Sequence, residues 1–276
     1  MCIIVKAQEA EATESEENII MKLMGYKREN GRYGVRNHLL IIPASVCSSE
    51  TAVNIAKLVD GAIAIPHQHG CCEIGDDFDT TKRTLVGFGK NPNVGAVLVV
   101  GLGCEGIQAK DIADEIKTTG KPVEYIVIQE EGGTAKTVSK GVEIAGKMAR
   151  EISKQNKVEF DISEIILGLE CGGSDPTSGL ASNPSIGVAS DMLVSMGGSS
   201  ILSETTEVIG AEHLLYPRFE DENEGKKFLE MVKRVENRSI AAGHDLREGQ
   251  PTPGNKAGGL TTIEEKSLGC MHKAGH

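Results

Sequence analysis

Three cysteines each follow an apolar, strand-like run, where a thiol could bind a metal, act as a nucleophile or pack in the core. They are Cys71 after residues 62–66, Cys104 after residues 96–100, and Cys171 after residues 165–169. If these runs are parallel strands, the thiols lie at the carboxyl ends of strands, where open α/β folds place their active sites. The pattern therefore predicts that the three cysteines belong to a functional site.

The first cysteine lies in a dense set of metal-ligating side chains. Residues 67–73 contain two imidazoles, two thiols and a carboxylate, beginning with His67. Imidazole and thiolate suit iron and zinc, although exposed histidines and packed cysteines would give the same composition. The chain has no C-x₂-C motif, so a structural zinc site is not expected.

The third cysteine opens a polar, glycine-rich loop. We expect this loop to lead into a helix with Ser182 or Asn183 as its N-cap and Pro184 at its first position. The amides of such a loop and the positive helix end can bind a carboxylate or phosphate, whereas a purely structural turn would use the same small residues. The candidates are Gly172, Gly173 and Asn183 for substrate binding, and Ser174 and Asp175 for catalysis.

Two further groups could contribute charge. The only basic cluster, residues 26–37, carries Arg28, Arg32 and Arg36. Arginine matches carboxylates bidentately, so these three are candidate clamps for an acidic substrate; a basic loop paired with the protein's own acids is equally compatible. Residues 203–213 supply carboxylates and an imidazole that could bind a metal or move protons. Of these, Glu207 could equally be a surface residue.

Composition excludes several classes of partner. The 276 residues carry a formal net charge of −11 and no tryptophan, which opposes binding to nucleic acid or to anionic membranes. No apolar run reaches the roughly 18 residues that span a bilayer. Seven cysteines, an odd number in glycine-rich turns, indicate metal-binding or catalytic thiols in a cytoplasmic protein rather than a disulfide framework.

Strand-like and helix-like segments alternate, which predicts an α/β fold with mainly parallel sheets and flanking helices. The expected strands cover residues 38–43, 62–66, 96–101, 124–128, 164–169 and 200–202. The expected helices cover residues 49–59, 80–88, 108–118, 134–154, 184–196 and 221–242.

We expect three regions along the chain. Residues 1–24 form an acidic leader without apolar periodicity. Residues 25–157 form a first α/β domain, and residues 158–276 begin a second one after a polar boundary. The part after Ala242 is rich in glycine and proline and is expected to be loop.

One motif points to a different function. Gly101-Leu102-Gly103-Cys104-Glu105-Gly106 matches the G-x-G-x-x-G pattern of dinucleotide-binding loops, and it follows a strand and precedes a helix. However, no acidic residue ends a second strand about 20 positions later, and a thiol and a carboxylate occupy the loop itself. A nucleotide-dependent enzyme is therefore the weaker interpretation.

Taken together, the motifs resemble the altronate and galactarate dehydratase family, which includes the large subunit of sulfolactate sulfo-lyase. Two departures are that only the acidic leader precedes Gly25, where family members carry or recruit a small β-rich domain, and that members continue beyond the equivalent of Gly275. Cys72 stands where a glycine is usual. The matching stretches are residues 25–37, 67–71, 91–93, 101–105, 170–175, 181–187, 203–212, 253–255 and 258–269.

The resemblance implies a two-domain, Rossmann-like hydro-lyase that dehydrates a sugar acid to a 2-keto-3-deoxy acid with iron as activator. Cys71, Cys104 and Cys171 could hold iron or an iron–sulfur cluster. Alternatively, Fe²⁺ or Mn²⁺ could be bound by His67 with carboxylates; the candidates are Glu105, Glu170 and Glu204.

His67 is the first candidate for proton transfer and Lys266 the second. Glu105 joins them as a candidate catalytic carboxylate. The expected partners are a sugar acid, a second copy of the chain and a separate small β-rich subunit. A sulfolactate sulfo-lyase subunit, or a non-catalytic subunit of a split dehydratase, are the alternatives.

Overall fold

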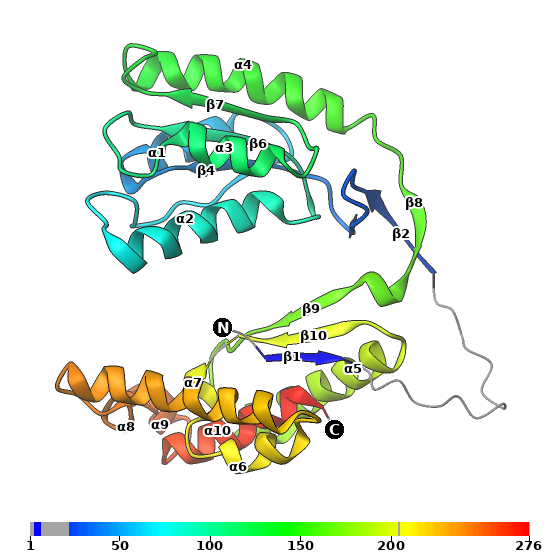
Figure 1. Cartoon of the computed structure of the whole chain (residues 1–276), viewed down its shortest axis with the longest axis vertical. Helices are drawn as coiled ribbons and strands as arrows, with labels where there is room; N and C mark the ends of the chain where they lie inside the picture. Colours follow the sequence, from blue (N-terminus) through cyan, green and yellow to red (C-terminus); the bar gives the residue numbers. More distant parts are fainter. Residues whose placement is uncertain (1–2, 7–21, 204, 276) are drawn as a thin grey trace. The chain divides into compact units, whose positions relative to one another are not determined.

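The computed structural model describes residues 3–6, 22–203 and 205–275. The chain divides into two compact units (Figure 1). The first unit is Leu23–Phe160; the second is Asp161–His276 together with Met1–Lys22. The expected acidic leader lies largely outside the described residues.

A four-stranded parallel sheet forms the centre of the first unit. Its order is β5 (Ala62–Ala64), β4 (His38–Pro43), β6 (Val94–Gly101) and β7 (Val123–Val127), and every neighbouring pair is parallel. All eight residues of β6 are buried, as expected for a parallel strand covered on both faces. This confirms the predicted α/β class.

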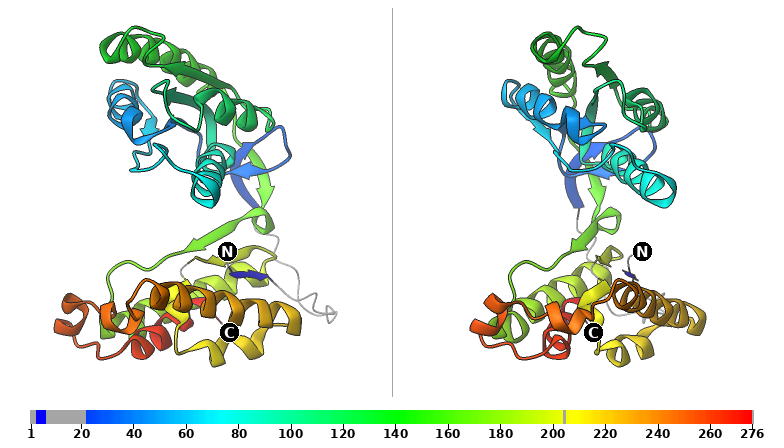
Figure 2. Two further views of the ribbon diagram at one scale, coloured as in Figure 1. Left: turned by 60° about the vertical axis from the view of Figure 1, so that its left-hand side comes forward. Right: turned by 90° about the vertical axis from the view of Figure 1, so that its left-hand side faces the viewer.

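Side chains alternate between the two faces of this sheet, and each face has its own helices (Figure 2). Leu39 and Ile41 pack with α1 (Val46–Lys57) and α4 (Thr134–Ile152). The intervening Leu40 and Ile42 pack on the opposite face, which is covered by α2 (Gly75–Lys90) and α3 (Ala109–Lys117). Each such fully buried side chain stabilises the fold by about 1.5–3 kcal/mol.

A small second sheet, of order β3 (Tyr33–Gly34), β2 (Lys22–Lys27) and β8 (Val158–Asp161), completes the first unit. The Tyr33 ring stacks on Phe160 with 4.9 Å between centroids. The buried Arg28 follows β2, and its guanidinium donates to the carbonyl of Pro92 at 2.7 Å and that of Arg36 at 3.0 Å. These bonds hold the start of the unit against the loop before β6.

The second unit contains a three-stranded sheet. Its central strand β10 (Ser199–Leu202) pairs parallel with β9 (Ile166–Leu169) and antiparallel with β1 (Ile3–Lys6). Its core includes Leu169, Leu202 and residues of the long helix α7 (Glu222–Ala241). The other elements are α5 (Asn183–Ser195), α6 (Glu212–Leu215), 3₁₀ turns at Ile162–Glu164, Thr205–Val208, Tyr216–Arg218 and His272–Ala274, and a π-helical turn at Ser178–Ser182.

The prediction of loop after Ala242 was wrong. The structure has α8 (Leu246–Gly249), α9 (Pro253–Ala257) and α10 (Ile263–Met271) there. Side-chain caps start the last two: Thr252 accepts from the amide of Asn255, and Thr262 accepts from that of Glu265. These helices are too short to show a clear apolar period, and α10 is held by tertiary burial of Ile263, Cys270 and Met271.

The predicted cap of α5 was also wrong. Ser182 has helical backbone angles and makes no capping bond, because the π-helical turn Ser178–Ser182 runs directly into the helix. Pro184 does lie in the first turn, as its fixed φ favours. No helix among the described residues is long and apolar enough to cross a membrane.

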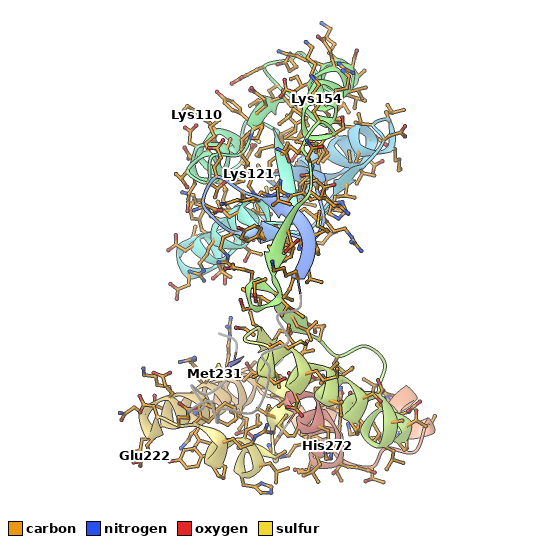
Figure 3. The ribbon with its side chains drawn as sticks, turned by 90° about the vertical axis from the view of Figure 1, so that its right-hand side faces the viewer. Lys110, Lys121, Lys154, Glu222, Met231 and His272 are labelled. Carbon is orange, nitrogen blue, oxygen red and sulfur yellow. The ribbon has the colours of Figure 1, made fainter. Side chains whose placement is uncertain are left out.

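Lys121 is a buried cation in the core of the first unit (labelled in Figure 3). Its ammonium donates to the carbonyls of Gly89, Asn91 and Val94 at 2.8, 2.9 and 3.0 Å. Burial lowers the pKa of Lys121 to about 8. The side chain thus satisfies three carbonyls at the turn between α2 and β6.

We expect Lys121→Met to lower the free energy of unfolding by about 2–6 kcal/mol, because the two buried carbonyls of Gly89 and Val94 lose their donor and each costs about 1–3 kcal/mol. Chemical denaturation monitored by circular dichroism would measure the change. Lys117→Met is the matched control: Lys117 lies on α3 with only an exposed ion pair, so its change should stay within about 0.5 kcal/mol. Equal effects of the two substitutions would contradict this role of Lys121.

Candidate functional site

The parallel sheet of the first unit places four thiols after three adjacent strands. Cys47 lies in the first turn of α1 after β4, Cys71 and Cys72 follow β5, and Cys104 follows β6. All four are exposed. Cys71 and Cys104 therefore lie beyond the carboxyl ends of the two strands that flank β4, as expected for strand-end residues. Cys47, which follows β4 itself, was missed by the sequence analysis.

The loop carrying Cys71 is fastened to the start of α1. The amide of Val46 donates to the carbonyl of His69 at 2.8 Å, and the hydroxyl of Ser49 donates to the carbonyl of His67 at 3.2 Å. Gly70 has a φ of +90°, and a Cβ there would lie 2.5 Å from the carbonyl oxygen of Ala44. Only glycine allows so close an approach.

The thiols of this loop interact with one another. The Sγ atoms of Cys71 and Cys72 are 3.9 Å apart, and Cys72 has a left-handed backbone with a φ of 57°. The hydrogen bond with Cys72, together with the neighbouring thiols of Cys72 and Cys47, raises the pKa of Cys71. The three sulfurs therefore form one electrostatically linked group.

His67 is held by backbone groups on both sides of its ring. Its Nε2 lies 2.9 Å from the carbonyl oxygen of Pro43, and its Nδ1 accepts from the amide of His69 at 3.2 Å. A carbonyl can only accept, so Nε2 carries the proton. His67 could transfer a proton or bind a metal only after one of these bonds breaks, and its catalytic role stays a prediction.

The carboxylate of Glu105 accepts hydrogen bonds from the backbone amides of the G-x-G-x-x-G loop in which it lies. The buried side chain accepts from the amides of Leu102 at 3.1 Å and Gly103 at 2.6 Å. A dinucleotide would need these loop amides for its pyrophosphate, so their use by Glu105 argues against the nucleotide interpretation. The neighbouring thiol of Cys104 is exposed, and its role as a metal ligand stays a prediction.

The three arginines have different environments. Arg28 is buried and also donates to Asn37 and Gln155, so its fork is occupied by the first unit itself. Arg32 and Arg36 are exposed. Arg32 and Arg36 are therefore the two predicted substrate-binding arginines that a substrate could reach.

In the second unit, two thiols and a carboxylate meet. One ligand atom from each of Cys171, Glu207 and Cys270 lies within 4.8 Å of the others. Cys171 follows β9, Glu207 lies in the 3₁₀ turn after β10, and Cys270 lies on α10. This is the one such group of three metal-ligating side chains among the residues that the structure describes, and a small pocket borders it, lined by Leu169, Leu202, Ser203, Glu207, Val208, Cys270, Met271 and Lys273.

A buried ion pair controls the charge of this group. The ammonium of Lys273 donates to Glu207 at 2.7 Å, and both side chains are buried. Burial is the largest single effect and lowers the pKa of Lys273, but the bond to Glu207 together with the charges of Cys270, Glu207 and Cys171 outweighs it, so the pKa of Lys273 is raised. Burial raises the pKa of Cys270 to about 12. The thiol of Cys270 is therefore protonated at neutral pH unless a cation displaces the proton.

Several predicted residues lie around Cys171. Burial raises the pKa of Cys171, Glu207 adds to this, and both the hydrogen bond with Ser174 and the charge of Lys266 oppose it. The Cys171 sulfur is 3.2 Å from the Ser174 hydroxyl. Lys266 is half-buried and donates to Gln250 at 3.2 Å.

The other predicted residues of this unit have structural bonds as well. Asp175 accepts from the amides of Thr177 and Ser178 at 2.8 and 3.1 Å. Glu170 accepts a hydrogen bond from Ser203 at 2.6 Å, and Asn183 donates to the carbonyl of Gly269 at 3.0 Å. Gly172 and Gly173 are exposed, and Glu204 lies outside the described residues.

The sequence analysis missed Cys270 and Lys273 and treated Glu207 as a carboxylate that could lie on the surface. Glu207 is buried. The available signal was the spacing of three between Cys270 and Lys273, which places them near each other on a helical segment, but α10 itself was not predicted. The prediction that Cys71, Cys104 and Cys171 share one site spans both units and stays a prediction.

Two family models match the chain. The second domain of D-galactarate dehydratase/altronate hydrolase matches residues 25–153, and the C-terminal domain of D-galactarate/altronate dehydratase matches residues 162–276. The chain belongs to the altronate/galactarate dehydratase family.

Characterised relatives in this family are lyases and dehydratases. The chain is 39% identical over 255 residues to the (2R)-sulfolactate sulfo-lyase subunit beta of Chromohalobacter salexigens, covering 91% of the chain and 64% of that protein. It is 37% identical over 261 residues to the altronate dehydratase of Escherichia coli, covering 91% and 52%. It is 35% identical over 272 residues to the altronate dehydratase of Bacillus subtilis, covering 95% and 54%.

The chain therefore spans between about half and two thirds of the length of these relatives. Its two matched segments are the family's second and C-terminal domains.

We expect Lys273→Met to destabilise the protein by about 3–5 kcal/mol, because it leaves the Glu207 carboxylate buried without its cation. Adding Glu207→Leu should recover much of this loss, since the remaining side chains are then both apolar. Thermal and urea unfolding would measure both. The control is Lys147→Met, which removes an exposed pair with Glu143 and should change stability by less than about 1 kcal/mol; an equally small effect of Lys273→Met would contradict the prediction.

Alkylation should distinguish the buried thiol from the exposed ones. With a pKa of about 12, Cys270 is thiolate in only about one molecule in ten thousand at pH 8. We expect iodoacetamide to modify Cys104 readily and Cys270 only after unfolding, as measured by peptide mass spectrometry. Reaction of Cys270 in the folded protein should rise about tenfold per pH unit; modification at pH 8 as fast as that of Cys104 would refute the assignment.

Proposed function

We propose that this protein is part of an iron-dependent hydro-lyase that dehydrates a sugar acid of the altronate or galactarate type to a 2-keto-3-deoxy acid. The observation that carries the proposal is the match of two consecutive family domains, over residues 25–153 and 162–276. The altronate dehydratases among its relatives share 35–37% identity with it.

The donor set of the second unit fits iron. Two thiols and a carboxylate, from Cys171, Cys270 and Glu207, approach within 4.8 Å, and sulfur ligands favour iron or zinc over Mn²⁺. Bound there, iron would act as a Lewis acid on the substrate. Loading requires loss of the thiol protons and competition with Lys273 for Glu207, so uptake should increase with pH.

The neighbouring loop supplies groups for an acidic substrate. Dehydration removes the proton beside the carboxylate, expels the next hydroxyl as water, and leaves an enol that becomes the 2-keto acid. Gly172 and Gly173 present an exposed backbone whose amides can bind the substrate carboxylate. Lys266, close enough to Cys171 to influence its charge, is the candidate for moving the proton, and Ser174 for orienting the hydroxyl.

A panel of sugar acids tests this function. We expect the purified protein, reduced and supplied with Fe²⁺, to convert altronate or galactarate to a 2-keto-3-deoxy acid, detected as its semicarbazone. Cys171→Ser and Glu207→Gln should each lower bound iron and turnover at least tenfold. Lys226→Met, at an exposed position of α7, should leave both unchanged. Full turnover by Cys171→Ser without bound iron would refute the proposed metal site.

A sulfo-lyase is the second candidate, because the chain is 39% identical to a sulfolactate sulfo-lyase subunit beta. The same proton removal would then expel sulfite instead of water. That relative is named as a subunit, which supports assembly with a second, small β-rich chain or a second copy of this chain. Sulfite release from sulfolactate, assayed alone and with such a partner, separates the candidates; an absence of turnover with every substrate and partner would support a non-catalytic subunit.

A further inference from the structure

We propose that Cys47, Cys71 and Cys72 form a second cation site, in the first unit, that binds a thiophilic divalent ion such as Zn²⁺. This inference does not depend on the proposed function, because it concerns a different unit and different thiols. The residues of the proposed lyase site in the second unit play no part in it.

The fold brings these thiols together from two segments of the chain. Strands β4 and β5 are neighbours and parallel, so the segments that follow them start at the same edge of the sheet. Cys47 belongs to the first turn of α1 after β4, and Cys71 and Cys72 to the loop after β5. The Cys71 thiol interacts with both of the others.

Backbone bonds keep the two segments in register. Val46, the residue before Cys47, donates its amide to the carbonyl of His69 at 2.8 Å. Gly70, the residue before Cys71, lies against the carbonyl of Ala44. The thiols are therefore carried by backbone whose relative position is set independently of any ion, which reduces the ordering cost of binding.

The chemistry of three thiols selects a soft cation. Thiolate ligands favour Zn²⁺ and related ions over Mg²⁺ or Ca²⁺, and three protein ligands leave a fourth tetrahedral position open to water. The sulfur atoms of Cys47, Cys71 and Cys72 do not all lie within 4.8 Å of one another. The three side chains are exposed, however, so a rapid change of rotamer can bring them onto one ion. Binding forms three metal–sulfur bonds and releases three protons to solvent, without any oxidation.

The left-handed Cys72 is the feature most specific to this site. Its φ of 57° is a conformation that non-glycine residues adopt uncommonly, and it sets the Cys72 sulfur 3.9 Å from that of Cys71. Adjacent cysteines in an extended segment would point to opposite sides. Here the two thiols lie close together instead, as binding of one cation by both sulfurs requires.

Cd²⁺ titration of the full chain tests the proposal, because Cd²⁺–thiolate bonds absorb in the ultraviolet. The titration uses a Cys171→Ser/Cys270→Ser background, in which the second unit's thiols cannot contribute. We expect one Cd²⁺ per chain, displaced by Zn²⁺, and at least a tenfold loss of affinity in Cys71→Ser and in Cys47→Ser. Cys104→Ser, an exposed cysteine at the same sheet edge, is the matched control and should bind as the background does.

Circular dichroism would establish that the background, which replaces the buried Cys270, and each further variant are folded. The thiols replaced in the first unit are exposed, so these further substitutions should not change the fold. A Cd²⁺ band that survives both Cys47→Ser and Cys71→Ser, or that is lost in Cys104→Ser alone, would overturn the proposal. Cys72→Gly provides a second arm: it removes one sulfur at a position whose backbone favours glycine, so the fold should be kept while the affinity falls at least tenfold.

Discussion

The first unit depends on burial of β4 and β6 from both faces. Apolar side chains of alternating direction pack against α1 and α4 on one side and against α2 and α3 on the other. Such a strand has no polar surface along its length, so every group able to do chemistry must lie beyond its ends. The thiols after β4 and β6 follow from this constraint.

The second unit uses a different solution, in which polar groups are buried and satisfy one another. Lys273 and Glu207 are paired beneath two thiols, within a core otherwise made of residues such as Leu202 and Met271. A buried pair of this kind adds little net stability compared with apolar side chains. The ammonium of Lys273 instead provides a positive charge at the carboxylate that lies with Cys171 and Cys270.

The sequence predicted the long elements and the strand-end cysteines because apolar periodicity and strand ends are local signals. It could not predict α10, whose nine residues are held by tertiary burial, and so it also missed Cys270 and Lys273. Likewise, no sequence pattern reveals that the Glu105 carboxylate accepts from the amides beside it, or that the Arg28 guanidinium donates to the carbonyl of Pro92. Such pairings depend on how side chains fold back, which residue type and spacing do not report.

The carboxylate of Glu105 gives the first unit an internal ligand. Its loop has the glycines and the strand-to-helix position of a phosphate-binding loop, and the carboxylate occupies the amides of Leu102 and Gly103 that an external anion would use. One side chain therefore closes this loop, and the amides that a phosphate would need are already bonded within the protein.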